Sequence, residues 1–175
     1  MNLMKIKSLK NSFYNTLILH HPSFNNENVE RLYNFIVDKN NNIRDWNEEY
    51  LSEFTRILKN FKPDDIQYFF ENINQWDSYY LVIIADKILN SNVKAQINYD
   101  LGRLYCKIFC SYEKFDSYYL IDNLEFAISM YHSKLNLSAL TDLNNKIELL
   151  YQNDSIKSQQ YQSSLDLLKK LQNEL

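Results

Sequence analysis

A six-residue block with the pattern aromatic–(Asn or Asp)–x–x–Tyr–Leu occurs three times in this chain of 175 residues. Asn and Asp are preferred N-cap residues, because their side-chain oxygen accepts a hydrogen bond from an amide of the first helical turn. The aromatic residue before the cap and the Leu inside the helix are placed to form a hydrophobic staple. The block therefore predicts three helices that begin in the same way. The copies are Trp46-Asn47-Glu48-Glu49-Tyr50-Leu51, Trp76-Asp77-Ser78-Tyr79-Tyr80-Leu81 and Phe115-Asp116-Ser117-Tyr118-Tyr119-Leu120.

The spacing of the copies, 30 and then 39 residues, is typical of stacked helical repeats. Residues 66–73 also match residues 105–112 in their apolar positions when they are shifted by 39 residues. We therefore expect antiparallel helix hairpins over residues 43–131, capped by helices in residues 1–42 and 132–175, within one all-α domain. An irregular helical bundle, in which good caps recur independently, is the alternative that the pattern leaves open. The 3.6-residue apolar period predicts about nine helices, at approximately 3–19, 29–36, 46–61, 63–73, 77–90, 92–112, 116–131, 136–150 and 155–173.

Glycine is nearly absent, with one residue in the chain, and proline occurs twice. Tight β-hairpins need residues with positive φ, and phosphate-binding loops need close approach of a ligand to the backbone, so both depend on glycine. The composition therefore disfavours β architectures and excludes the glycine-rich nucleotide-binding motifs. A hydrophobic content of 45%, with 15% aromatic residues, indicates a packed core.

The formal net charge of −3 argues against nucleic acid as a partner, because proteins that bind nucleic acid usually carry a basic stripe. The most apolar run, residues 79–85, is much shorter than the ~20 residues that cross a membrane. The amino end alternates Lys with apolar residues and so lacks the apolar run of a secretory signal. The two cysteines, Cys106 and Cys110, suit a reducing compartment. We therefore expect a cytoplasmic protein that engages neither membranes nor nucleic acid.

The helix predicted from Trp76 to Asn90 and its two relatives resemble HEAT-like (armadillo-type) helical repeats. The resemblance covers about half of the chain, and it implies a short right-handed solenoid that acts as a binding module. A small, acidic, Asn-rich and all-helical chain is also similar in type to bacterial immunity proteins that neutralise a toxin domain. No motif carries this second likeness.

Corresponding positions of the three block helices would form one ribbed surface if these helices stack side by side. The positions i, i+4, i+7 and i+11 hold five carboxylates, one Arg and two Tyr. Tyr and Arg are common anchors of protein interfaces, and an acidic surface attracts a basic partner. We therefore predict a non-catalytic module that holds a basic protein, such as a toxin domain, and blocks its active site. An ordinary solvated flank is the alternative for the same positions. The predicted partner-binding residues are Glu49, Glu53, Arg56, Tyr79, Asp86, Tyr118, Asp122 and Glu125.

Carboxylate pairs on one helical face leave an enzymatic function open. The pairs Glu27/Glu30 and Asp122/Glu125 have i, i+3 spacing, and Mg²⁺ binds several hard oxygen ligands. A small metal-dependent hydrolase is therefore the enzymatic alternative, and a structural adaptor in a larger assembly is a third function. No cofactor or zinc site is predicted, because the Cys and His residues do not follow the spacing of zinc ligands.

Most aromatic residues are predicted to be structural. Trp46 and Trp76 stand at the staple positions of their helices. Many tyrosines lie on apolar stripes, where a ring packs in the core and its hydroxyl finds one partner. This group includes Tyr50, Tyr80, Tyr105 and Tyr119.

Overall fold

The computed structural model describes residues 22–39, 46, 48–111, 117–130 and 135–173, and these residues form helices and no strands. The predicted all-α fold is thereby confirmed, with nine α-helices and two short 3-10 helices (η) in the described ranges. The helix predicted at 3–19 lies outside them. The elements are α2 (Glu27–Lys39), α3 (Glu48–Lys59), α4 (Pro63–Glu71), η2 (Ile73–Gln75), α5 (Ser78–Ile88), α6 (Ser91–Lys94), α7 (Leu101–Phe109), η3 (Tyr118–Asn123), α8 (Leu124–Ser129), α9 (Leu137–Gln152) and α10 (Ser158–Gln172).

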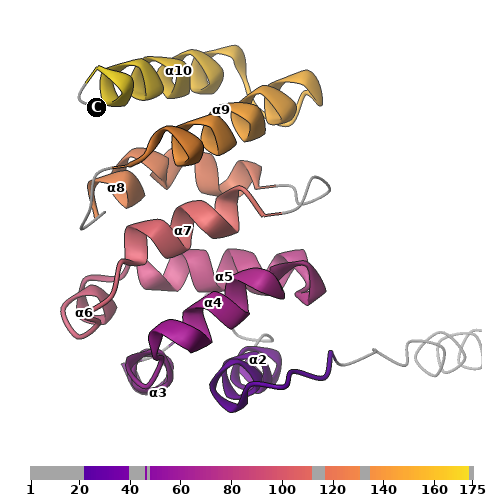
Figure 1. The fold of residues 1–175 in the computed structure, drawn as a ribbon, viewed down its shortest axis with the longest axis vertical. Coiled ribbons are helices and arrows are strands. Elements are labelled where there is room, and N and C mark those ends of the chain that lie inside the picture. Colours follow the sequence, from indigo (N-terminus) through magenta and orange to yellow (C-terminus); the bar gives the residue numbers. More distant parts are fainter. Residues whose placement is uncertain (1–21, 40–45, 47, 112–116, 131–134, 174–175) are drawn as a thin grey trace, which may run out of the picture.

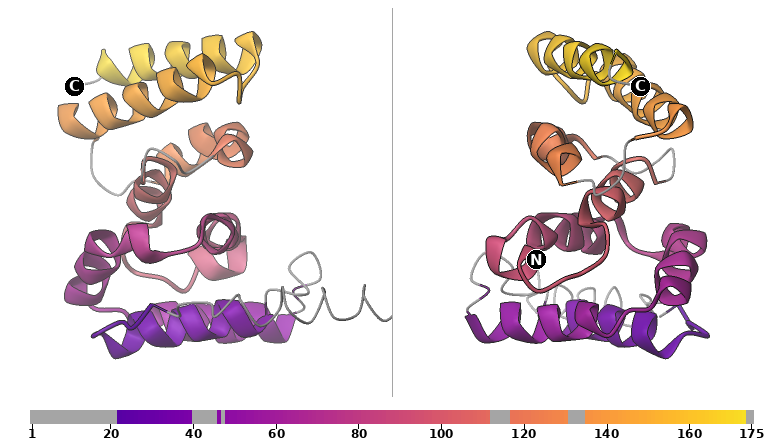
Figure 2. Two further views of the ribbon diagram at one scale, coloured as in Figure 1. Left: turned by 90° about the vertical axis from the view of Figure 1, so that its right-hand side faces the viewer. Right: turned by 60° about the vertical axis from the view of Figure 1, so that its left-hand side comes forward.

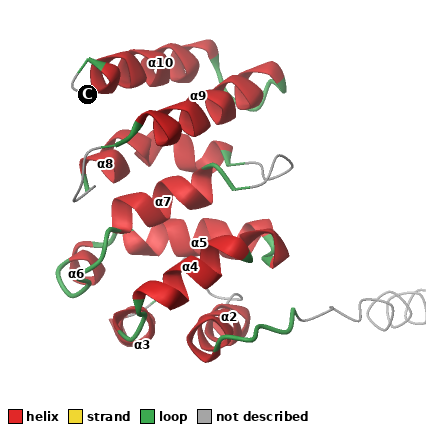
Figure 3. Cartoon of the chain, viewed as in Figure 1, coloured by secondary structure: helices red, strands yellow, loops and turns green. Residues whose placement is uncertain are grey.

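Apart from α6, which lies back towards α3, the helices follow one another along the long axis in chain order, from α2 and α3 at one end to α9 and α10 at the other (Figure 1). Short loops join most of them (Figure 3). Figure 1 shows α2 and α3 nearly end-on while α5 runs across the page, and a quarter turn reverses this (Figure 2, left). The α2–α3 pair therefore crosses α5 instead of running alongside it. A stack in chain order is common to a short solenoid and to an irregular bundle, so the HEAT-like arrangement stays a prediction.

Several predicted helix starts are confirmed by their caps. The carboxylate of Asp77 accepts a hydrogen bond of 2.8 Å from the Tyr79 amide at the start of α5. The side chain of Asn136 accepts one of 2.9 Å from the Ala139 amide at the start of α9. Pro63 occupies the first position of α4, where its missing N–H costs nothing. The capping residues of the other two block copies, at 47 and 116, lie outside the described residues.

The single helix predicted over residues 92–112 is wrong, because two helices, α6 and α7, occupy this stretch. Asn90 caps α6 through a 2.9 Å bond from the Asn92 amide, and Asp100 caps α7 through a 2.8 Å bond from the Arg103 amide. A side chain that accepts from the backbone in this way competes with the continuing helix. Tyr99 lies between the two helices, and its hydroxyl donates to the Leu58 carbonyl of α3 at 3.3 Å. The polar caps and this tertiary contact together divide the segment.

The third block copy does not begin a regular α-helix either. Residues 118–123 form the 3-10 helix η3, and the α-helical geometry starts only at Leu124. The Tyr105 hydroxyl, buried in α7, donates a 2.6 Å bond to the Leu120 carbonyl inside η3. That carbonyl is therefore held by a neighbouring helix. The predicted helix over 116–131 is corrected to η3 followed by α8.

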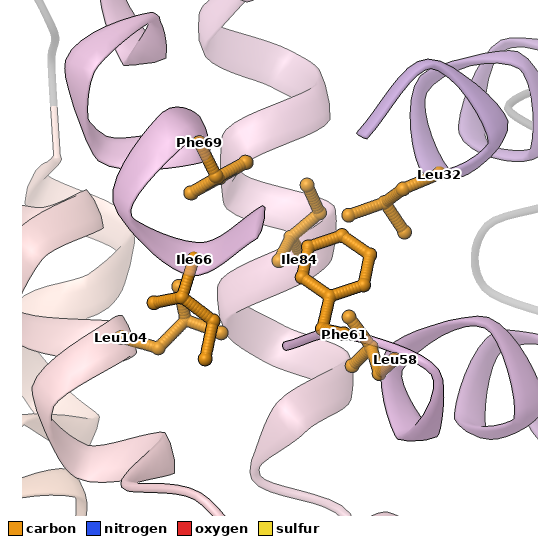
Figure 4. A pocket seen from close by; sticks show the side chains of 7 residues that line it. All are labelled: Leu32, Leu58, Phe61, Ile66, Phe69, Ile84 and Leu104. Atoms are coloured by element: carbon orange, nitrogen blue, oxygen red, sulfur yellow. The ribbon is translucent and has the colours of Figure 1, made fainter. Parts of the chain in front are cut away.

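The centre of the core is α5, as its nearly continuous apolar surface predicts. It packs against α2, α6, α7 and η3, and its buried residues are Leu81, Ile83, Ile84, Ala85 and Ile88. A small apolar cavity of about 10 Å³ lies where α5 meets α2, α3, α4 and α7 (Figure 4). A space of this size holds about one water-sized sphere, and its purely apolar lining gives a water no partner. The lining residues are Leu32, Leu58, Phe61, Ile66, Phe69, Ile84 and Leu104.

The two tryptophans are buried, as predicted for structural residues, and both pack on α2. The Trp46 ring lies 5.4 Å from that of Phe35, measured between centroids. The Trp76 ring lies 5.2 Å from the rings of Tyr33 and of Phe69 in α4. The residues before α3 and before α5 therefore anchor α2 at two separate places.

A buried carboxylate, Asp65, joins the starts of α2 and α4. Its Oδ1 accepts from Asn26 Nδ2 at 2.8 Å, and its Oδ2 accepts from Asn28 Nδ2 at 2.9 Å. The Lys62 backbone amide donates to the same Oδ2 at 2.7 Å. Asn26 in turn caps α2, because its Oδ1 accepts from the Val29 amide at 3.0 Å. One side chain thus fixes two helix starts relative to each other.

Within the described residues, no helix combines the length and the apolar character that crossing a membrane requires.

Candidate functional site

The predicted binding residues on α3 do not form an acidic patch. Glu53 is paired with Arg56, whose Nε donates to Glu53 Oε2 at 2.8 Å, and Arg31 of α2 lies 3.6 Å away. The hydrogen bond from Arg56 is the main cause that lowers the pKa of Glu53, against the opposing effect of burial. Two guanidinium groups therefore surround one carboxylate. Glu49 is exposed in the first turn of α3, at the positive end of the helix dipole.

On α5, the predicted stripe is interrupted in its middle. Tyr79 is 53% exposed at the start of the helix, but Ile83, one turn later, is buried. Asp86 follows and is exposed, with its carboxylate 2.9 Å from Lys87 Nζ. The Lys87 ammonium also lies 5.7 Å from the centroid of the Trp46 ring. The Asp86 charge is therefore balanced in part by a neighbour that Trp46 helps to hold.

The three predicted stripes are only partly brought together. α3 crosses α5, so its stripe does not run beside that of α5 (Figures 1 and 2). α5 does pack against η3. Burial raises the pKa of the Tyr105 hydroxyl, and the charges of Asp86 and Asp122 raise it further. The second and third stripes therefore lie on elements that pack against each other, whereas the first lies on a helix that crosses α5.

A row of exposed side chains follows η3 into α8. A 3-10 helix has 3.0 residues per turn, so residues at i and i+3 are aligned. Tyr119 and Asp122 share one side of η3 in this way, and Glu125 comes three residues later.

Tyr119 is 63% exposed, so its predicted place in the core is wrong. Tyr118 is half-buried and lies against Tyr119, with ring centroids 3.7 Å apart. Because of the 3-10 geometry, the residue aligned with Asp122 is Tyr119 and not Tyr118, which the α-helical spacing predicts. We call Tyr119, Asp122 and Glu125 the η3–α8 row.

A groove of about 490 Å³ separates η3 and α8 from α10. Asp122 and Glu125, both predicted to bind a partner, line one wall. The opposite wall belongs to α10, which lies in the region 132–175 that the sequence predicts to cap the repeats. Because these residues lie more than thirty positions further along the chain, no local pattern marks them as part of this site. The α10 residues in the lining are Gln159, Gln160, Ser163, Ser164 and Leu167, together with Lys157 just before the helix.

Gln160 connects the two walls of the groove. Its Nε2 donates to Asp122 Oδ1 at 2.8 Å, and its Oε1 accepts from the Lys157 backbone amide at 3.0 Å. The Gln160 carbonyl also accepts from the buried Ser164 hydroxyl at 2.8 Å. Both ends of the side-chain amide are therefore engaged, and Gln160 fixes the orientation of one Asp122 oxygen.

Neither predicted carboxylate pair is joined by a third potential metal ligand among the described residues, where no three His, Cys, Asp or Glu side chains gather. Glu27 and Glu30 are both exposed in α2. Cys106 is buried, and burial raises the pKa of the Cys110 thiol far above its usual range. A thiol of this kind is a weak nucleophile, because the thiolate is the reactive form.

No family model, curated protein or solved structure matches this chain. The resemblance to HEAT-like repeats and the likeness in type to immunity proteins therefore stay predictions. The candidate site rests on its own geometry.

Proposed function

We propose that this protein is a non-catalytic module that holds a basic protein partner on the η3–α8 row. The observation that supports the proposal is the placing of one exposed tyrosine beside two exposed carboxylates at the edge of a groove. Among the described residues, no Lys or Arg forms an ion pair with Asp122 or Glu125, in contrast to Glu53 and Asp86. These two charges are therefore free to meet a basic surface.

Each part of the row has a role in such an interface. An exposed Tyr119 ring offers apolar area and a hydroxyl at a low cost in conformational entropy, as interface tyrosines usually do. Asp122 and Glu125 accelerate encounter with a basic partner and disfavour acidic ones. The proposed surface also includes Tyr79 and Asp86, two exposed residues of α5, which packs against η3. The likeness in type to immunity proteins favours one form of this function, in which the module blocks the active site of a toxin domain.

A structural adaptor would use the same surface, with a partner that is not an enzyme. The metal-dependent hydrolase stays the enzymatic alternative, because Asp122 and Glu125 line a groove that a small substrate could enter. A rise in Tm on addition of Mg²⁺ or Mn²⁺ would favour the hydrolase, since a ligand that binds only the folded state stabilises it.

The proposal is tested by capture of a partner from the native host and by binding measurements with that partner once purified. The test variant combines Asp86→Lys, Asp122→Lys and Glu125→Lys. The control variant combines Glu27→Lys, Glu30→Lys and Asp38→Lys, three exposed carboxylates of α2 that give the same change in net charge. We expect the test variant to lose the partner and the control variant to retain it. Equal binding by wild type and test variant would reject the proposed surface.

A further inference from the structure

The groove between the η3–α8 row and α10 has an apolar base and an acidic side. Ile121 and Leu124 are buried and Leu167 is half-buried, and all three line the groove together with Asp122 and Glu125. Long basic side chains have matching chemistry, because their methylene groups cover apolar surface while the charged end stays near water. An arginine suits two neighbouring carboxylates best, since its planar guanidinium presents several donors at once.

The two carboxylates are positioned to accept such donors. Gln160 engages only Oδ1 of Asp122, at 2.8 Å, so Oδ2 keeps its full capacity as an acceptor. Among the described residues, no side-chain hydrogen bond or ion pair engages the Glu125 carboxylate. Because Gln160 is held at both ends of its amide, Asp122 does not have to be ordered when a ligand arrives, which lowers the cost of binding.

We propose that this groove seats an arginine side chain of the basic partner, with its guanidinium on Asp122 and Glu125 and its methylene groups on the half-buried Leu167. This inference rests on the proposed function and adds α10 to the binding surface. Gln160 is a positioning residue in it, because it acts on the partner through Asp122.

Lys157 and Glu125 have opposite charges, so removing either charge should change arginine binding in opposite directions. Lys157 lies at the end of the groove where α10 begins, and no ion pair joins it to either carboxylate among the described residues. Its ammonium therefore repels an arriving guanidinium, as does the positive end of α10. Removing the Lys157 charge must strengthen binding of an arginine, whereas removing the Glu125 charge must weaken it.

The experiment is an NMR titration of the ¹⁵N-labelled full chain with Nα-acetyl-arginine methylamide. The matched probe is Nα-acetyl-citrulline methylamide, which has the same shape without the charge, at equal ionic strength. We expect the arginine probe to shift the amide signals of Asp122, Glu125, Ser163 and the Gln160 side chain, with a millimolar dissociation constant. We expect Glu125→Gln to weaken this binding about two- to fivefold and Lys157→Gln to strengthen it by a similar factor, as is usual for one exposed charge.

Three results would overturn the inference. These are equal shifts with both probes, shifts centred outside the groove, and affinity changes of the same sign in the two variants. The proposed function is judged separately by partner capture. A partner that is lost with the Asp86/Asp122/Glu125 reversal, while the arginine probe fails to shift the groove signals, would reject the groove and leave the proposed surface standing.

Discussion

The replacement Asp65→Asn should destabilise the protein by about 3 kcal/mol, because Asp65 joins the starts of α2 and α4. An amide at this position keeps one oxygen, which can replace Oδ2 and accept from Asn28 and Lys62. Its NH₂ group then faces the NH₂ of Asn26, whose own oxygen is occupied in capping α2. One hydrogen bond to a charged acceptor is lost, at about 1.5–3 kcal/mol, and two more weaken to neutral ones.

The matched control is Asp64→Asn, one residue earlier in the same first turn. Asp64 is exposed, so this change removes only a favourable charge near the positive end of α4, at about 0.3–1 kcal/mol. Urea unfolding followed by tryptophan fluorescence suits the comparison, because Trp76 packs on Phe69 of α4 and on Tyr33 of α2. Equal free energies of unfolding for the two variants at pH 7 would refute the reasoning.

The Asp65 contribution should also depend on pH in a defined direction. Burial acts to raise the pKa of Asp65, but the hydrogen bonds from the Lys62 amide and from Asn26 and Asn28 outweigh it, so the pKa lies below its ordinary value. A carboxyl with a depressed folded-state pKa stabilises fully above its unfolded pKa of about 3.9 and loses this contribution as the pH falls through the folded-state value. The difference between wild type and Asp65→Asn should therefore be constant from pH 7 to 5 and shrink below about pH 4. A difference that stays unchanged well below pH 3 would contradict this explanation.

The remaining predictions concern three single side chains. Tyr105→Phe removes the buried hydroxyl that donates to the Leu120 carbonyl, and it should lower the free energy of unfolding by about 1–2 kcal/mol in urea titrations. Cys110 should react slowly with a thiol-specific chromogenic reagent at pH 8 in the folded protein and rapidly in urea, because burial raises its pKa. Fast reaction of the folded protein would show that the Cys110 thiol is accessible. Tyr119→Ala should leave the Tm unchanged and weaken partner binding about tenfold or more, measured by calorimetry with the purified partner. A variant that binds as tightly as wild type would remove Tyr119 from the interface.

Local sequence signals predicted the parts of the fold that local chemistry controls. Asp77 and Asn136 cap α5 and α9 because each needs only an amide two or three residues away. The central position of α5 followed from apolar residues around its circumference. The division of α6 from α7 depends in part on the bond from Tyr99 to Leu58, which are 41 residues apart, and no periodicity contains it.

The candidate site was predicted only in part, because local sequence patterns reveal some of its residues and not those brought in by long-range contacts. Asp122 and Glu125 were found through their place in the repeated block, and the structure places both at one groove. Gln160 could not be found in this way, because its role comes from a contact with Asp122 across 38 residues. The sequence shows that Glu53 is acidic, but it does not show that Arg31 of another helix lies beside it, because only the fold brings the two together.

The proposed site lies at the third block copy, whose structure differs most from the α-helix that the block predicts. In the first copy, Glu53 is neutralised by two arginines, and in the second, Asp86 is paired with Lys87. The third copy forms a 3-10 helix, which a bond from Tyr105 holds in place, and its three-residue turn aligns Tyr119 with Asp122. An α-helix would instead have aligned Tyr118 with Asp122, as the sequence predicts. Departures from local preference are expected where function constrains a chain. The 3-10 turn that carries the exposed Tyr119 therefore supports the proposed binding site.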